Sequence, residues 1–370
     1  MIYSCAGDVI TSWLESVIEE LRDEFPKTRS GKRKREPDRF TPSPSSSTTF
    51  SMSAKRRRGE VADADDIFAT PQPPPRALTD ASSTSKTPIK QFQRMEVAAH
   101  DPVRLRQLSV EDPELPETLR TIVQDLSLLA KSRGIIHQGL QASPLPACCL
   151  VTECQNEMHP EASWNMLVHQ RILALAAPPC WEREGPVHFM PCTTAKIHPA
   201  YRRGSGTGSA KMVDFAMYVE PSAFGVDDAT AVDKARTRLP EASINHTDFA
   251  PLRRRPIALS IQSKATGHQL LEAEVQVGVW LAAQWRMLES LSEDKAAAVM
   301  PPFLPAVIIQ GHDWHFVSTT RSGGCTTLWA KQTFGSSETV LGIYQLVCIL
   351  RYLGQWAAQH YWSCFRQCIL

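Results

Sequence analysis

The chain has 370 residues, of which 42% are hydrophobic and 21% charged, and its formal net charge is +1 at pH 7. This length and apolar content allow one substantial core within two or three domains. The longest apolar run, residues 340–350, is interrupted by Gln345 and is too short to span a bilayer. Acidic residues near the N-terminus argue against a signal peptide, so we expect reduced cysteines and no membrane partner. Membrane, collagen-like and disulfide-scaffold classes are excluded.

The near-neutral total conceals two parts of opposite charge. Residues 27–60 contain eleven Lys or Arg and three Asp or Glu, a local net charge of +8. Because the whole chain carries +1, the remainder must carry −7. A strongly basic segment is therefore attached to a mildly acidic remainder, and the two parts predict different partners.

Residues 1–25 have the pattern of one amphipathic helix. Between Asp8 and Phe25, apolar residues recur at three- and four-residue spacing, with acidic residues on the opposite face. A helix of about 17 residues is only marginally stable by itself, so we expect it to dock on an apolar surface. Two surfaces remain open: the folded domain of the same chain, or a protein partner.

Residues 26–102 are predicted to form a disordered, basic, Pro/Ser-rich linker. Stretches such as TPSPSSSTTFSMS and PQPPPR contain few large apolar residues and cannot bury enough surface to offset the entropy of ordering. Two basic clusters within it, Lys32–Arg35 and Lys55–Arg58, have the pattern of a bipartite nuclear-import signal. We therefore expect a nuclear location. The alternative is a solvated charge run that binds polyanions without sequence preference.

Residues 103–370 alternate helical and strand patterns. Apolar residues with helical spacing predict helices at 113–131, 161–176, 269–291 and 339–364. Short apolar runs predict strands at 211–219, 256–264 and 305–311. From residue 161 onward the order is helix–strand–strand–helix–strand–helix, which predicts an α/β domain.

Polar residues interrupt two of these strands. The strand at 256–264 is mostly apolar, which is typical of a central strand, yet one face carries Gln262 and Lys264. Because Lys is rarely buried without a partner, we expect an anionic group or a metal-bound water near Lys264. Asp214 lies in the middle of the strand at 211–219, where Asp is disfavoured. If the two strands pair, these three side chains can converge.

An Asp on one strand, followed by an acid or amide, any residue and a Lys on the next, is the arrangement of the PD-(D/E)XK nuclease superfamily. The chain resembles a fungal family of PD-(D/E)XK nuclease-like proteins over most of residues 157–364. The resemblance is carried by five segments in order: EASWNMLVH, VDFAMYV, PIALSIQSK, QVGVWLAAQW and LPAVIIQGHDWHF. It implies a restriction-endonuclease-like mixed sheet flanked by helices, over residues 103–370, after a disordered N-terminal region.

The resemblance also implies a hydrolase that cleaves nucleic-acid phosphodiesters, with DNA the first candidate, and that uses Mg²⁺ or Mn²⁺. Asp214, Gln262 and Glu161 would then hold the metal, since Mg²⁺ prefers hard oxygen ligands. Lys264 would position the attacking water or offset charge developing on the phosphorane. Gln276 is similar to a glutamine that the family carries on the helix after the Lys strand.

Position 262 departs from the superfamily pattern, because it holds Gln where an acid is usual. An amide oxygen can ligate a metal but supplies no negative charge, so Mg²⁺ affinity should fall unless Glu161 compensates. The alternative function is therefore a catalytically inactive nuclease fold that binds nucleic acid or protein.

A nuclease must also attract a polyanion, although this part of the chain is net acidic. Basic residues adjoin the two strands at Arg202–Arg203, Lys211 and Arg253–Arg255. They predict a local basic patch beside the site, and the alternative is a set of scattered surface cations.

Overall fold

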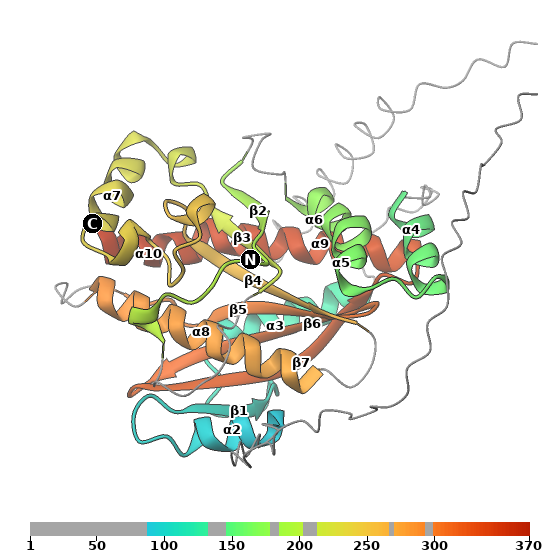
Figure 1. Ribbon diagram of the computed structural model, residues 1–370, viewed down its shortest axis with the longest axis horizontal. Coiled ribbons are helices and arrows are strands. Elements are labelled where there is room, and N and C mark those ends of the chain that lie inside the picture. Colours follow the sequence, from blue (N-terminus) through green and yellow to red (C-terminus); the bar gives the residue numbers. More distant parts are fainter. Residues whose placement is uncertain (1–86, 132–145, 178–184, 203–212, 266–269, 293–298) are drawn as a thin grey trace, which may run out of the picture. The chain divides into compact units, whose positions relative to one another are not determined.

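A mixed β-sheet of seven strands organises the computed structural model of the chain (Figure 1). The structure describes residues 87–131, 146–177, 185–202, 213–265, 270–292 and 299–370, which all belong to one compact unit. The strands are β1 (Val103–Gln107), β2 (Val187–Pro191), β3 (Phe215–Val219), β4 (Ile257–Lys264), β5 (Leu304–Gln310), β6 (Asp313–Ser322) and β7 (Cys325–Ser336).

The spatial order of the strands is β1-β7-β6-β5-β4-β3-β2. β1 is parallel to β7 and β4 is parallel to β5, while the other neighbours are antiparallel. The helices are α2 (Pro88–Glu96), α3 (Glu117–Ala130), α4 (Pro146–Asn156), α5 (Glu161–Trp164), α6 (Gln170–Ala176), α7 (Val226–Arg236), α8 (Leu270–Ser292), α9 (Val340–Trp356) and α10 (Trp362–Ile369). Two π-helical turns, Asn165–His169 and Ala357–Tyr361, join α5 to α6 and α9 to α10.

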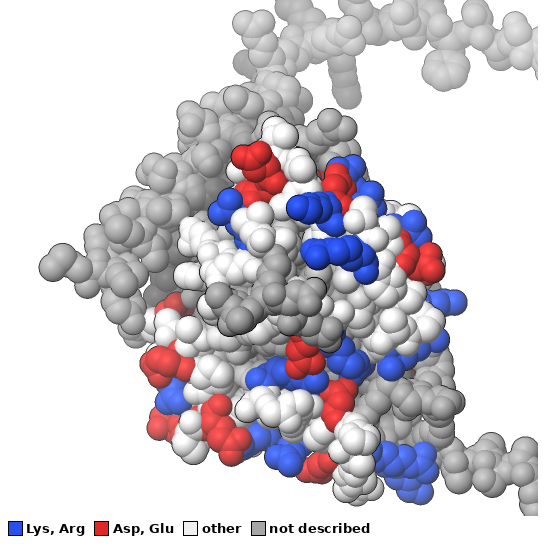
Figure 2. Space-filling view, turned by 90° about the vertical axis from the view of Figure 1, so that its left-hand side faces the viewer, with Lys and Arg blue, Asp and Glu red and all other residues white. Residues whose placement is uncertain are grey.

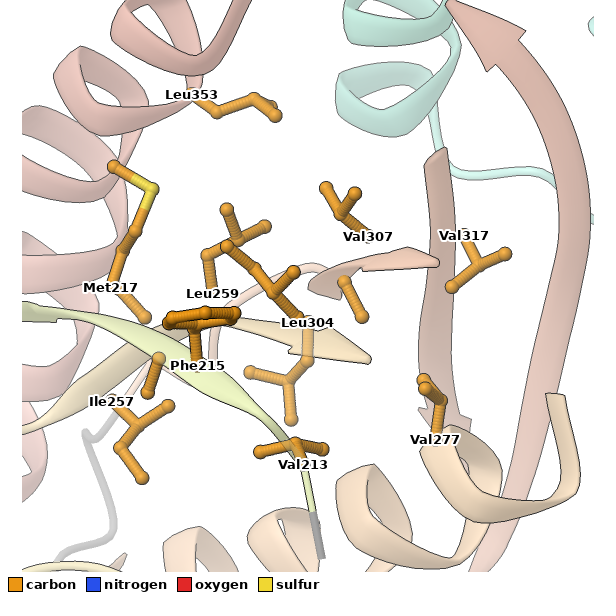
Figure 3. Close-up of a cluster of buried hydrophobic side chains, with 14 of the residues drawn as sticks. Val213, Phe215, Met217, Ile257, Leu259, Val277, Leu304, Val307, Val317 and Leu353 are labelled. Carbon is orange, nitrogen blue, oxygen red and sulfur yellow. The ribbon is translucent and has the colours of Figure 1, made fainter. Parts of the chain in front are cut away.

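Helices cover both faces of the sheet. α8 lies on one face, where Trp280 Nε1 donates to Ser260 Oγ of β4 at 2.9 Å. α9 lies on the other, and Figure 3 shows Met217 and Leu353 together on the α9 side, with Val277 of α8 across the sheet. Because both faces are covered, β4 is buried from its first residue to Ser263. This explains its nearly continuous apolar sequence.

The predictions of fold class and of the central elements are confirmed. The chain forms an α/β domain whose mixed sheet is flanked by helices. β4, β5 and α8 each begin and end within one residue of the predicted bounds. The last helix, predicted to end at residue 364, continues through a π turn to Ile369.

Several elements outside the sheet centre were not predicted. β6 and β7 form a hairpin whose turn residues Gly323 and Gly324 have φ of 54° and 74°. A Gly-Gly pair between two runs rich in Thr and aromatic residues is a hairpin signal that could have identified both strands. β1, β2, α2, α4 and α7 are short and bury few residues each, so their apolar periodicity is weak.

Other predicted boundaries were also wrong, among them the start of the helix predicted at 113, which begins at Glu117. The strand predicted at 211–219 begins only at Phe215, so Asp214 precedes β3 instead of lying within it. The linker predicted to extend to residue 102 ends earlier, because α2 is helical and buries Phe92 against the domain. Residues 1–86 lie outside the described ranges, so the N-terminal helix, the rest of the linker and the two basic clusters remain predictions. Among the helices of the described ranges, none is long and apolar enough to cross a bilayer.

Two glycines of α9 provide a test of its packing. A Cβ at Gly342 would overlap the carbonyl oxygen of Ser336, whereas a Cβ at Gly354 would meet Met217 Cε at an ordinary 3.5 Å. We expect Gly342→Ala to lower the free energy of unfolding by about 1–3 kcal/mol through overpacking. Gly354→Ala should be neutral or stabilising by up to about 1 kcal/mol, since Ala is the better helix former. Urea denaturation measures both, and equal effects would contradict this packing.

Candidate active site

The candidate site lies where β3 begins and β4 ends. Phe215 is paired with Ile261, so Asp214, one residue before β3, stands beside the last residues of β4. The Asp214 N–H donates to Ile261 O at 2.9 Å, and its carbonyl accepts from the Cys192 N–H at 2.8 Å. Backbone hydrogen bonds on both sides therefore hold Asp214 in place.

One carboxylate oxygen of Asp214 accepts three hydrogen bonds from β4. Its Oδ2 accepts from Gln262 Nε2 at 2.6 Å, from the Ser263 N–H at 2.8 Å and from Ser263 Oγ at 3.1 Å. The Asn165 side chain also lowers the pKa of this carboxyl. Burial raises the pKa of Asp214 above its ordinary 3.8, while these donors and the nearby Lys264 ammonium oppose the rise.

The orientation of the Gln262 amide follows from its contacts. Nε2 donates one hydrogen to Asp214 Oδ2 and the other to the Ser263 carbonyl at 2.9 Å. The reverse orientation would place the amide oxygen against two acceptors, so it is excluded. Oε1 is consequently left buried, with no hydrogen-bond partner among the described residues.

Lys264 and Glu161 form the more open part of the site. The Lys264 ammonium lies 3.9 Å from Glu161 Oε2, and the two side chains are 12% and 34% exposed. Glu161 is the first residue of α5, and the backbone at Ala265 contributes to lowering its pKa. Burial raises the pKa of Glu161, Lys264 lowers it, and the Asp214 charge raises it further. The two carboxylates therefore lie close enough to repel each other.

Gln276 approaches the same end of β4 from α8. Along this helix, Gln284 Nε2 donates to the Ile257 carbonyl at 2.7 Å, and Trp280, one turn earlier, contacts Ser260. Gln276 is one further turn toward the start of α8, so it faces the last residues of β4. Its Oε1 is buried and, like that of Gln262, has no hydrogen-bond partner among the described residues.

These unpartnered oxygens bear on metal binding. Within the described ranges, no three Asp, Glu, His or Cys side chains gather around one point. Two carboxylates, of Asp214 and Glu161, and two amide oxygens, of Gln262 and Gln276, are nevertheless oxygen ligands of the kind that Mg²⁺ and Mn²⁺ prefer. Buried acceptors without partners are rare, because each costs about 1–3 kcal/mol. The chemistry of these oxygen atoms suits a divalent cation, but the set supplies little negative charge to hold one.

The sequence-predicted site residues thus come together, but two residues that act on Asp214 were missed: Ser263 by hydrogen bonds and Asn165 through its effect on the pKa. Ser263 lies on the other face of β4 by strand alternation, and it reaches Asp214 because Asp214 precedes the strand β3. Asn165 lies four residues after Glu161. Two helical residues at this spacing share a face, and that signal could have identified Asn165.

The basic patch expected beside the site is not formed by Arg253–Arg255. These residues precede β4, whose eight residues at about 3.3 Å each place them roughly 25 Å from Lys264. Two of them already form ion pairs: Arg254 with Asp233, and Arg255 with Glu220. Figure 2 shows the end of the molecule that carries α7, where cationic and anionic side chains alternate. Of the other candidates, only Arg202 is described, and its Nε donates to the Ile197 carbonyl.

The comparisons with known proteins identify what this arrangement is similar to. Residues 150–362, more than half of the chain, match the family model of the PD-(D/E)XK nuclease superfamily. The matched range contains all of the predicted site residues, and also Asn165 and Ser263. Neither the curated proteins nor the solved structures give a match. The fold implied by the resemblance of the sequence is thereby confirmed, whereas a fungal origin remains only an expectation.

The raised pKa of Asp214 predicts how this carboxyl affects stability. Since the folded protein binds a proton there more tightly than the unfolded chain does, the ionised carboxyl destabilises the fold above its raised pKa. We expect Asp214→Asn to raise the Tm of the metal-free protein at about pH 8, by an amount that shrinks toward about pH 4. Differential scanning fluorimetry measures this, with Asp248→Asn, at an exposed aspartate, as the matched control. If the change in Tm followed the same pH trend in both variants, it would contradict a raised pKa of Asp214.

Proposed function

Because the chain belongs to the PD-(D/E)XK nuclease superfamily, we propose that it hydrolyses nucleic-acid phosphodiesters with one bound divalent cation. The proposal rests on one observation: Asp214, Gln262 and Lys264 lie together at the end of β4. Glu161 Oε2 lies 3.9 Å from the Lys264 ammonium. Burying two carboxylates beside one ammonium is costly, because the single Lys264 charge cannot offset both Asp214 and Glu161. Such charges are typical of a site for a charged substrate.

The roles of the residues follow from their positions. Asp214, Glu161 and the two amide oxygens would hold the cation, with Mg²⁺ or Mn²⁺ the ions that suit such ligands. These residues would hold the cation, which would polarise the phosphoryl oxygen and lower the pKa of a bound water. Lys264 donates a hydrogen bond to the attacking water, or offsets the negative charge that develops as the phosphorus–oxygen bond breaks.

DNA is the substrate we propose first. The family implies a nucleic acid, and the basic clusters at Lys32–Arg35 and Lys55–Arg58 support a nuclear location where DNA is available. Lys and Arg side chains of the predicted linker attract nucleic-acid phosphates independently of sequence, and this attraction weakens as the salt concentration rises. They would substitute for the basic patch that Arg253–Arg255 do not provide.

Nuclease assays with Mg²⁺ or Mn²⁺ on single- and double-stranded DNA and RNA test the proposal. We expect Asp214→Ala and Lys264→Ala each to slow cleavage on the order of 10²–10³-fold, because each removes an electrostatic contact to the reacting phosphate or its metal. The matched control is Lys234→Ala, at an exposed lysine of α7, which should cleave at the parental rate. Cleavage that survives both site substitutions would remove these residues from the mechanism.

One observation favours the alternative of an inactive nuclease fold that binds nucleic acid or protein. Asp214 Oδ2 is occupied by three donors, and Gln262 supplies one of them. The usual acid at position 262 could not donate this hydrogen bond when ionised, and would instead share a cation with Asp214. The Gln262 amide therefore stabilises the metal-free site, which is the property expected of a fold that has lost its metal.

Gln262→Glu distinguishes the two functions. It places a second carboxylate where Nε2 now lies 2.6 Å from Asp214 Oδ2. Without metal, we expect a loss of about 1–3 kcal/mol in the free energy of unfolding, since a hydrogen bond becomes a repulsion. Mn²⁺ should raise the Tm of this variant more than that of the parent or of Gln107→Glu, an exposed control on β1. If Gln262→Glu cleaves nucleic acid and the parent does not, the parent is inactive. Cleavage by the parent would exclude the alternative of an inactive nuclease fold.

A further inference from the structure

The segment that follows β2 runs past the backbone of Asp214. We call residues 192–202 the β2 loop. It starts where β3 begins, because Pro191, the last residue of β2, is paired with Phe215. The Cys192 N–H donates to the Asp214 carbonyl at 2.8 Å, and the Cys192 thiol donates to the Val213 carbonyl at 3.6 Å. The β2 loop therefore leaves the sheet directly beside the candidate site.

The β2 loop is held in a fixed conformation. The Ala195 N–H donates to the Cys192 carbonyl at 2.8 Å and closes a turn. Ile197 forms an antiparallel β-bridge with Thr247. The side chains of Cys192, Ala195 and Ile197 are all buried, at 0%, 1% and 2% exposure. Because the loop is already ordered, little conformational entropy is lost when its remaining, exposed side chains bind a ligand.

Two of these exposed side chains are cations that one hydrogen bond brings near each other. Arg202 Nε donates to the Ile197 carbonyl at 2.7 Å, and Lys196 is the residue before Ile197. Neither cation forms an ion pair with a residue that the structure describes. The bridge between Ile197 and Thr247 places Asp248 across from Lys196, but the two charges are not paired. Both cations therefore remain available to an anion from solvent.

The charge around these two residues is positive. Residues 185–202 contain no Asp or Glu, so Lys196 and Arg202 give this described segment a net charge of +2 with neutral histidines. Arg254 and Arg255 differ, because each is paired with a carboxylate. Unpaired Lys and Arg are the usual ligands of nucleic-acid phosphates, and Arg can contact two phosphate oxygens at once.

The chain geometry limits how far Lys196 lies from the site. A hydrogen bond joins Cys192 to Asp214, and the turn brings Ala195, the neighbour of Lys196, close to Cys192. With about 7 Å across such a turn and about 3.8 Å between adjacent Cα atoms, the Lys196 Cα lies no more than about 17 Å from that of Asp214. A duplex rises about 3.4 Å per nucleotide of each strand, so one strand spans this distance in about five nucleotides.

We propose that Lys196 and Arg202 bind the nucleic-acid backbone, at a phosphate within a few nucleotides of the one that reaches Asp214. Exposed hydroxyls of Thr193 and Thr194, in the turn of the same loop, add donors to the strand. The β2 loop then supplies, within the folded domain, the local basic surface that is missing at the start of β4. This role rests on the nucleic-acid binding that the proposed function requires.

The salt dependence of binding tests the proposal. Fluorescence anisotropy of a labelled short DNA duplex, and of its single strand, measures the affinity of the full chain with EDTA present to prevent cleavage. Losing one phosphate contact should reduce the slope of log affinity against log salt by about 0.9 on the duplex and about 0.7 on the single strand. For Lys196→Ala we therefore expect an affinity about 5–8-fold lower at about 0.1 M salt, with the difference vanishing toward about 1 M.

Matched variants separate a phosphate contact from a general effect of charge. Lys234→Ala removes the same charge from an exposed lysine of α7, which lies near the start of β4 through the pair of Asp233 with Arg254, and should keep the parental slope. Lys196→Arg should also keep it, since the cation is retained. Lys196→Glu should bind more weakly than Lys196→Ala, with an unchanged Tm, because an exposed side chain repels phosphate without disturbing the core.

The outcomes are distinguishable. If the parent binds or cleaves nucleic acid and the slope for Lys196→Ala equals that for Lys234→Ala, the phosphate contact is overturned and the proposed function stands. If the parent binds without cleaving and Lys196→Ala has the reduced slope, the contact stands and the cleavage is overturned. If the parent neither binds nor cleaves, both are overturned. Where binding in EDTA is too weak to measure, KM for cleavage at two salt concentrations gives the same comparison.

Discussion

The hydrogen bonds between Asp214 and the end of β4 are the interaction on which the site depends. A carboxylate that is only 9% exposed is costly to bury unless donors surround it. Three donors to one oxygen come from two consecutive residues, Gln262 and Ser263. They reach Asp214 only because Phe215 is paired with Ile261. A slip of one residue in this register would turn every side chain of β4 to the other face.

That register is maintained by the core at some distance from the site. Met217 and Leu259, paired across β3 and β4, face α9, where Leu353 lies on the same side of the sheet (Figure 3). On the opposite face, Trp280 and Gln284 of α8 hydrogen-bond to β4. The same contacts that bury the central strand therefore place Gln276 over its end. In this domain, packing and the assembly of the site are not separable.

The glutamine at position 262 gives the site two opposed properties. As a donor, it makes the buried charge of Asp214 tolerable without a cation, which an ionised acid at this position could not do. As a neutral side chain, it leaves the site with less negative charge to hold a cation. Its unpartnered Oε1, together with that of Gln276, leaves a polar environment that still favours a cation or a donor. The site is therefore intermediate between a strong metal centre and a purely structural network.

Local patterns in the sequence determined the elements that are buried on both sides or amphipathic, because apolar periodicity reports directly on burial. β4, β5 and α8 could be bounded within one residue, and Asp214, Gln262 and Lys264 could be singled out, since polar residues in a buried strand conflict with their surroundings. The tertiary structure alone decided the contact between Asp214 and Gln262, 48 residues apart, and the two hydrogen bonds from Ser263 to the same carboxylate. It also placed Arg253–Arg255 at the far end of β4. Such relations depend on strand register and on how helices dock, and neither leaves a periodic pattern in the chain.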